Sequence, residues 1–240
     1  MKTTYTLIAS MFLLLTFSLA NSQSKNTIGN GKVTYQNRTV SESFDKIHIE
    51  QGLTVYLSMD MEEKISVETD ENLQDIIKTE IKDGLLKIYC SETIYSARHK
   101  NIYVSVLSLS EIKTSSGSSL VSENTLITDS IKTKASSGSA ISLQVSTNSL
   151  VANASSGSAL ELKGKTNSLI TKSSSGSTID AYKLNSQDVE SNASTGSSTL
   201  IRASYKLVAK ASSGGHISQK GAAKIIEKKT SSGGRVSIKK

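Results

Sequence analysis

The sequence predicts an all-β protein: a parallel β-helix, or β-solenoid, with a strand-rich N-terminal region. Three observations support this. A Ser/Thr-Gly element recurs after residue 110, apolar and polar residues alternate through residues 25–107, and the 240-residue chain has no Pro, no Trp and only 5% aromatic residues. Alternation with period two is typical of half-buried strands, and repetition at a fixed period is typical of solenoids. Aliphatic and small side chains must therefore fill the interior.

Residues 1–20 are predicted to be a cleaved secretory signal. Lys2 is followed by an apolar stretch from Leu7 to Leu19, and a small-x-small junction ends at Ala20. This order of charge, apolar run and small residues is typical of signal peptides. The apolar run is shorter than the roughly 20 residues of a membrane-spanning helix, and no later stretch approaches that length. We therefore expect an exported chain with no transmembrane segment, located in the periplasm, on the outer surface or outside the cell.

Residues 21–110 are predicted to form a strand-rich head or cap that packs on the first coil. Alternation is clear in residues 47–57, and Asp83 and Gly84 are residue types that permit the positive φ angles of a tight hairpin turn. The only cysteine, Cys90, shares the apolar phase of a strand and is expected to be a buried thiol. Whether these strands continue the solenoid is left open.

Residues 111–240 contain seven copies of a repeat and are predicted to form the solenoid. The first glycine of each copy stands at 117, 138, 157, 176, 196, 214 and 233, a spacing of 18 to 21 residues. Three residues after the glycine stand Leu120, Ile141, Leu160, Ile179, Thr199, Ile217 and Val236. Seven residues before it stand Ser110, Ile131, Leu150, Leu169, Val189, Leu207 and Ile226. Three residues before it stand Thr114, Ala135, Ala154, Ser173, Ala193, Ala211 and Thr230. Stacked coils would bury these columns between two sheets.

A column of long polar side chains, four residues before each glycine, lies on the opposite phase and must face outward. This Lys/Asn column consists of Lys113, Lys134, Asn153, Lys172, Asn192, Lys210 and Lys229. Serine stands two residues before the glycine in all seven copies, on the same outward phase. Because repeated donors suit repeated anions, we hypothesise weak, multivalent binding of an anionic polysaccharide or another envelope polymer. The alternative is a solvated strip that discourages lateral sheet aggregation.

The best candidate acid pair is Glu161 and Asp180, each four residues after its glycine. These carboxylates are expected to stack on adjacent coils about 5 Å apart. Such a pair could support glycoside hydrolysis in a retaining geometry or share a cation. The alternative is a pair of solvated carboxylates whose mutual repulsion is relieved by Lys163 and Lys165. A further outward column is expected six residues after the glycine, at Glu123, Gln144, Lys163, Tyr182, Arg202, Lys220 and Lys239.

Three segments of the N-terminal region carry a family resemblance. They are Ile28–Gly31, Arg38–Val40 and Phe44–Ile47, followed by strands and glycine-punctuated repeats. Together with the signal and the repeats, they resemble the head GIN domain family of putative auto-transporter adhesins, a bacterial domain of unknown function. The resemblance covers residues 27–236. It implies a right-handed β-helix in an exported protein of a Gram-negative bacterium, and it brings no catalytic residues.

The sequence predicts no catalytic residue, metal site or cofactor. It contains no G-x-S-x-G elbow, Walker loop or G-x-G-x-x-G fingerprint. A nucleophile is unique in its site, so serines present in seven copies are interpreted as corner residues. No Cys/His cluster has metal-binding spacing. Nucleic acid is disfavoured despite a net charge of +7, because the repeats lack interleaved aromatics for base stacking.

The function predicted from these features is that of a non-catalytic, adhesin-like or envelope-binding module. Two alternatives remain open: a polysaccharide-acting enzyme, and a passive structural scaffold. The oligomeric state and the ligand are not predicted.

Overall fold

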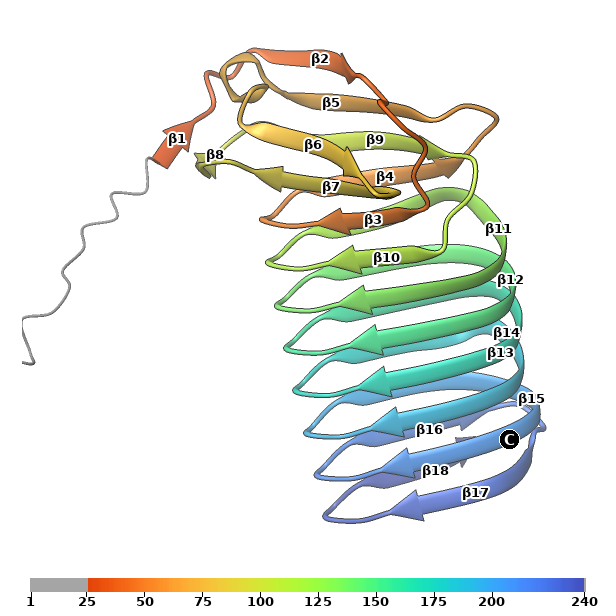
Figure 1. Ribbon diagram of the computed structural model, residues 1–240. Helices are drawn as coiled ribbons and strands as arrows, with labels where there is room; N and C mark the ends of the chain where they lie inside the picture. Colours follow the sequence, from red (N-terminus) through yellow and green to blue (C-terminus); the bar gives the residue numbers. More distant parts are fainter. Residues whose placement is uncertain (1–25, 240) are drawn as a thin grey trace, which may run out of the picture.

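The protein is a β-solenoid, which confirms the predicted fold class (Figure 1). A computed structural model describes residues 26–239, so the predicted signal at residues 1–20 lies outside the described residues. No helix in the described part of the chain is long and apolar enough to span a membrane. The elements in chain order are β1 (Asn26–Ile28), β2 (Val33–Arg38), β3 (Lys46–Ile49), β4 (Thr54–Met59), β5 (Lys64–Asp70), the 3-10 turn η2 (Glu71–Leu73), β6 (Ile77–Lys82), β7 (Leu85–Cys90), β8 (Thr93–Ser96), β9 (Lys100–Val106), β10 (Glu111–Thr114), β11 (Ser119–Ala135), β12 (Ala140–Ala154), β13 (Ala159–Ser173), β14 (Thr178–Ala193), β15 (Ser198–Ala211), β16 (His216–Lys220), β17 (Lys224–Thr230) and β18 (Arg235–Lys239).

Two parallel sheets form the walls of the solenoid. Each of β11 to β15 is long enough to pass round one corner, so that its C-terminal part belongs to what we call the first sheet and its N-terminal part to the second sheet. The first sheet ends in β17 and the second in β18. Figure 1 shows the coils stacked along one axis, with the cap at one end and the C-terminal coil at the other.

The N-terminal region contributes two coils and a cap. In the first sheet, β3 pairs in parallel with β10 and with β7. In the second sheet, β4 pairs in parallel with β11 and with β9. The strands β2, β5 and β6 instead pair antiparallel and cover the end of the stack. The predicted hairpin joins β6 to β7, with φ of 51° at Asp83 and 73° at Gly84.

A tight turn at one corner of each coil explains the Ser-Gly repeat. In the third copy, Ser156 has φ of 52° and Gly157 has φ of 70°, and the Ser158 N–H donates to the Ser155 carbonyl at 3.2 Å. Positive φ at both central residues is the type I′ geometry. The Gly157 N–H donates to the Ser175 carbonyl of the next turn at 3.0 Å, so the turns themselves form a ladder.

An eighth copy of this turn lies in the N-terminal region. Gln51 and Gly52 have φ of 62° and 67°, and the Gly52 N–H donates to the Ser116 carbonyl at 2.9 Å. The coil formed by β3 and β4 therefore has the same corner as the seven coils predicted from the repeat.

The predicted inward columns form one continuous core, apart from half-buried Ser110 and exposed Ile226 and Thr230. The column three residues after the glycine is buried in every coil, with at most 6% exposure at Val236. In the column seven residues before the glycine, the prediction is wrong for the last member, Ile226. The register shifts in β17, so Ile225 and not Ile226 pairs with Leu207. Thr230 keeps its predicted register opposite Ala211 but is exposed, because no coil follows it among the described residues.

Interior hydroxyl groups are paired. The Ser158 hydroxyl donates to the Ala135 carbonyl at 2.8 Å and accepts the Ser155 N–H at 3.0 Å. Deeper inside, the Thr171 hydroxyl donates to that of Ser191 at 2.8 Å. An unpaired hydroxyl in this position would cost about 1 to 3 kcal/mol, so the pairing allows small polar residues to replace aromatic ones.

The segment Ile28–Gly31, which carries part of the family resemblance, has a structural role. The side chain of Asp70 is fully buried and accepts the Gly31 N–H at 2.5 Å and the Arg98 N–H at 2.8 Å. The Asn72 side-chain amide donates to the Ile28 carbonyl at 2.9 Å. These contacts tie the first residues of the described chain to the cap.

Candidate functional site

The candidate site lies on the outer face of the first sheet, along the Lys/Asn column. All seven residues of the column occupy equivalent positions on successive strands of the first sheet, and we call each such level of the stack a rung. Each residue pairs with the next, from Lys113 through to Lys229. The column is longer than the sequence predicted. His48 pairs with Lys113, and Lys87 pairs with His48. A signal for His48 was present, since it stands four residues before Gly52, which occupies the turn position described above.

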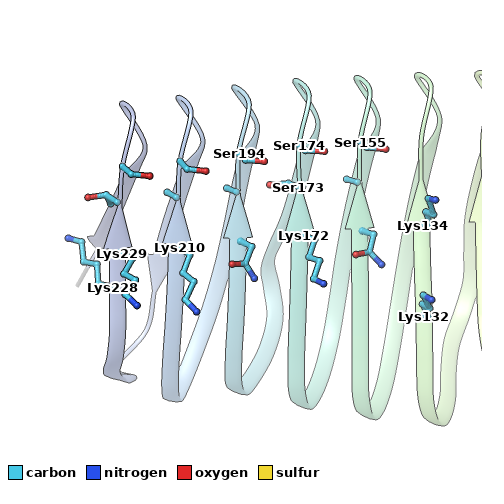
Figure 2. Close-up of a pocket in the computed structure, with 18 residues that line it drawn as sticks. Lys132, Lys134, Ser155, Lys172, Ser173, Ser174, Ser194, Lys210, Lys228 and Lys229 are labelled. Carbon is cyan, nitrogen blue, oxygen red and sulfur yellow. The ribbon is translucent and has the colours of Figure 1, made fainter.

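A groove of about 1000 Å³ runs along this face between the Lys/Asn column and the turns. The column supplies one side and the serines two residues before the glycines supply the other. Figure 2 shows Lys134, Lys172, Lys210 and Lys229 on successive parts of the stack, with serines nearer the turns. The floor consists of residues whose side chains point into the core, among them Ala154. Six lysines and no acidic residue are among the described residues that line the groove: Lys132, Lys134, Lys172, Lys210, Lys228 and Lys229.

Carboxylates neutralise the two ends of the column and leave its middle cationic. Glu111 contacts Lys113 at 2.5 Å and His48 at 3.2 Å. Burial raises the pKa of Glu111, but hydrogen bonds from Lys113 and His48 outweigh it, so the pKa lies below its ordinary value. At the other end, Glu227 contacts Lys229 at 2.6 Å and Lys210 at 3.3 Å.

The central lysines of the column differ from those at its ends. Among residues 26–239, no ion pair involves Lys134 or Lys172. Both side chains are exposed. Their ammonium groups therefore retain three donors each for a ligand.

The predicted acid pair is in register, and lysines contact one of its two carboxylates, that of Glu161. Glu161 lies opposite Asp180 on the outer face of the second sheet, away from the groove. The Lys163 ammonium contacts Glu161 at 2.9 Å and that of Lys183 at 3.8 Å. The hydrogen bond from Lys163 lowers the pKa of Glu161, and burial opposes this in part. Lys165 does not pair with Glu161; Lys183 takes that place.

The outward column predicted six residues after the glycine is interrupted. Gln144 pairs with Thr125 rather than Glu123, and Lys163 pairs with Lys183 rather than Tyr182. In both places the register shifts between neighbouring strands. The Tyr182 hydroxyl instead donates to that of Ser218 at 2.5 Å.

The cap contains a polar cluster that the sequence did not reveal. Glu68, only 7% exposed, accepts hydrogen bonds from Tyr35 at 2.6 Å, Tyr103 at 2.9 Å and Asn101 at 2.9 Å. Burial raises the pKa of Glu68, but these three donors outweigh it and lower the pKa. Burial and the bond to Glu68 raise the pKa of Tyr103 to about 12. Both carboxylate oxygens are satisfied, so the cluster stabilises the cap.

Metal-binding geometry is not found in the part of the chain that the structure describes, where no three His, Cys, Asp or Glu side chains gather. Cys90 is buried in β7, as the sequence predicted, and burial raises the pKa of its thiol.

Comparison with solved structures shows the same fold in other proteins. A putative adhesin from Bacteroides fragilis NCTC 9343 has a TM-score of 0.80 at 18% identity, covering 89% of this chain and 99% of that chain. A putative adhesin from Parabacteroides merdae ATCC 43184 has a TM-score of 0.71 at 19% identity, covering 90% and 99%. A protein from Parabacteroides distasonis ATCC 8503, described as a putative lipid binding protein, has a TM-score of 0.72 at 18% identity, covering 90% and 100%.

Comparison with protein families gives a match that spans most of the sequence. No curated protein matches the chain. The family described as "Putative auto-transporter adhesin, head GIN domain" matches residues 43–223, which include both N-terminal coils and most of the repeats. The chain therefore belongs to the head GIN domain family of putative auto-transporter adhesins.

Proposed function

We propose that the protein is a non-catalytic, adhesin-like module of the cell envelope or the extracellular space that binds an anionic polysaccharide in the groove of the first sheet. Membership of a family of putative adhesins supports the adhesin-like role. The predicted signal at residues 1–20 supports an exported location.

The observation that carries the proposal is the charge of the groove. Six lysines and no acidic residue line about 1000 Å³ of open space among the described residues. Because Lys134 and Lys172 have no carboxylate partner there, a polyanion can pair with them without breaking an existing contact. Each exposed ion pair contributes little, about 0.2 to 1 kcal/mol, so useful affinity requires a polymer that occupies several rungs at once.

The non-catalytic part of the proposal is supported by the state of the acid pair. A general acid in a glycosidase needs a raised pKa, whereas the Lys163 contact lowers that of Glu161. The pair also lies on the sheet opposite the groove, so a polymer held by the Lys/Asn column would not reach it.

The test replaces Lys134, Lys172 and Lys210 together by Gln and measures retention on immobilised anionic polysaccharides at low and at physiological ionic strength. The matched control replaces Lys165, Lys220 and Lys239 by Gln, which removes the same charge from exposed positions outside the groove. We expect the first variant to bind about tenfold more weakly, because it loses three ion pairs of about 0.5 kcal/mol each.

Binding should also weaken as salt rises, since exposed charges are screened over about 8 to 10 Å at moderate ionic strength. Equal weakening in both variants would show that net charge alone is responsible. Binding that is indifferent to salt and to both variants would refute the proposal.

A further inference from the structure

Lysine and asparagine alternate along the central part of the groove. The order on five consecutive rungs is Lys134, Asn153, Lys172, Asn192 and Lys210. Neighbouring strands of a sheet are about 4.8 Å apart, which places a lysine every 9.6 Å or so along the axis. The groove thus presents an ammonium group on every second rung, of which that of Lys210 also contacts Glu227 at 3.3 Å.

The neighbouring outward residues add no cation to the asparagine rungs. On the rungs of Asn153 and Asn192, the adjacent outward positions in the same strands hold Val151 and Glu190. The Asn192 side-chain amide donates to Glu190 at 3.2 Å. The asparagine rungs therefore carry no compensating cation, and one of them carries an anion.

At the same adjacent position, the Lys134 rung holds a second lysine, Lys132, and the other two lysine rungs hold apolar residues. Ile170 stands beside Lys172 and Val208 beside Lys210, and both are half-buried. They provide an apolar edge that suits the C–H face of a sugar ring. Each of these two rungs thus offers one ammonium group and one apolar contact.

From this alternation we infer that the groove selects a linear polysaccharide in which anionic sugars alternate with neutral ones. The inference rests on the proposed function and specifies its ligand. One sugar of an extended chain advances by about one rung, so an anion on every second sugar meets Lys134, Lys172 and Lys210 in turn. The intervening neutral sugars meet Asn153 and Asn192, whose amides donate to and accept from hydroxyl or acetamido groups.

A polysaccharide with an anion on every sugar fits this arrangement less well. Half of its carboxylates would face asparagines, and one would lie beside Glu190. Like charges at such close range oppose binding. The spacing therefore disfavours a fully charged polyuronate even though its total charge is higher.

The experiment compares three oligosaccharides of equal length by calorimetry or fluorescence titration at low salt. The probes are a hyaluronan fragment, charged on alternate sugars; an oligogalacturonate, charged on every sugar; and a neutral chitin oligosaccharide. We expect the purified protein to bind the hyaluronan fragment about tenfold more tightly than the oligogalacturonate, because the extra carboxylates of the latter face asparagines and one of them is repelled by Glu190. The chitin oligosaccharide should bind most weakly.

The variant Asn153→Lys/Asn192→Lys fills the neutral rungs and should reverse the preference toward the oligogalacturonate. Its control is Asn148→Lys/Asn167→Lys, which adds the same charges to two exposed residues of β12 and β13 outside the groove. The control should leave the preference unchanged. Circular dichroism establishes that both variants are folded.

The outcomes separate the two proposals. If the oligogalacturonate binds the unaltered protein as tightly as the hyaluronan fragment, or if the first variant keeps the original preference, the inference is wrong while the proposed function stands. If neither anionic oligosaccharide binds the unaltered protein, both fall.

Discussion

Gly164→Ala tests how tightly neighbouring coils approach each other. Gly164 has φ of 109° and lies opposite Val145 of the preceding coil. A Cβ at this position would stand 2.0 Å from the Val145 carbonyl oxygen and 3.0 Å from its carbon. Val145 is fully buried in the core, so its backbone cannot move aside without disturbing the stack.

The matched control is Gly157→Ala in the tight turn. Gly157 also has positive φ, at 70°, but a Cβ there would meet nothing within 4 Å. Both substitutions carry the backbone strain of about 1 to 2 kcal/mol of an L-residue in left-handed space. Only Gly164→Ala adds overpacking, which costs typically about 1 to 3 kcal/mol. We therefore expect losses of roughly 2 to 5 kcal/mol for Gly164→Ala and about 1 to 2 kcal/mol for Gly157→Ala.

The assay is urea-induced unfolding followed by far-ultraviolet circular dichroism, with hydrogen exchange to detect coils that open separately, as stacked repeats can do. The unfolding midpoint should fall further for Gly164→Ala than for Gly157→Ala. If the two midpoints coincide, or their order is reversed, the steric argument fails.

Three further outcomes are expected. Because the folded-state pKa of Glu68 is lowered, the ionised carboxylate stabilises the fold fully above the unfolded pKa of about 4.3, and this stabilisation is lost as pH falls through the folded-state pKa. In Glu68→Gln the free energy of unfolding should therefore fall less steeply below that pH. An unchanged dependence on pH would contradict this. Lys228 is exposed on β17, the last described strand of the first sheet. Because lysines on an edge strand discourage pairing with another chain, Lys228→Ile should make sedimentation concentration-dependent, whereas a strictly monomeric variant would argue against that role. Leu160→Ala, at a site with 1% exposure, should cost about 2 to 5 kcal/mol in urea unfolding, and a loss below 1 kcal/mol would show that the coils collapse into the cavity.

The repeat made much of the solenoid predictable, because its glycines mark a corner that recurs in each coil. Counting from Gly157 places Leu160 inside and Asn153 outside, and the same count works for the other turns. Counting fails where a strand shifts register beyond the turn. Such shifts put Lys183 where Tyr182 was expected and Ile225 where Ile226 was expected.

Other features depend on contacts between distant segments. The coil formed by β3 and β4 is separated from the repeats by the cap strands, so only the Gln51–Gly52 turn marks it as a related unit. The bonds of Glu68 to Tyr35 and Asn101 join residues 33 positions apart in each case, a separation that no local pattern encodes. For the groove, the sequence predicted the column of side chains, but the carboxylates that neutralise its ends required the structure.

The backbone hydrogen bonds between coils point along the stack, and this has a mechanical consequence. Tension that pulls the two ends of the stack apart would load the interfaces between coils in series, so that each carries the same force and the weakest separates first. The antiparallel strands cover one end; among residues 26–239 the coil of β17 and β18 has a neighbouring coil on one side only, so separation would begin there. A sideways pull on one sheet would instead strain many hydrogen bonds together. The protein should therefore yield more easily to tension along the stack than to shear across its coils.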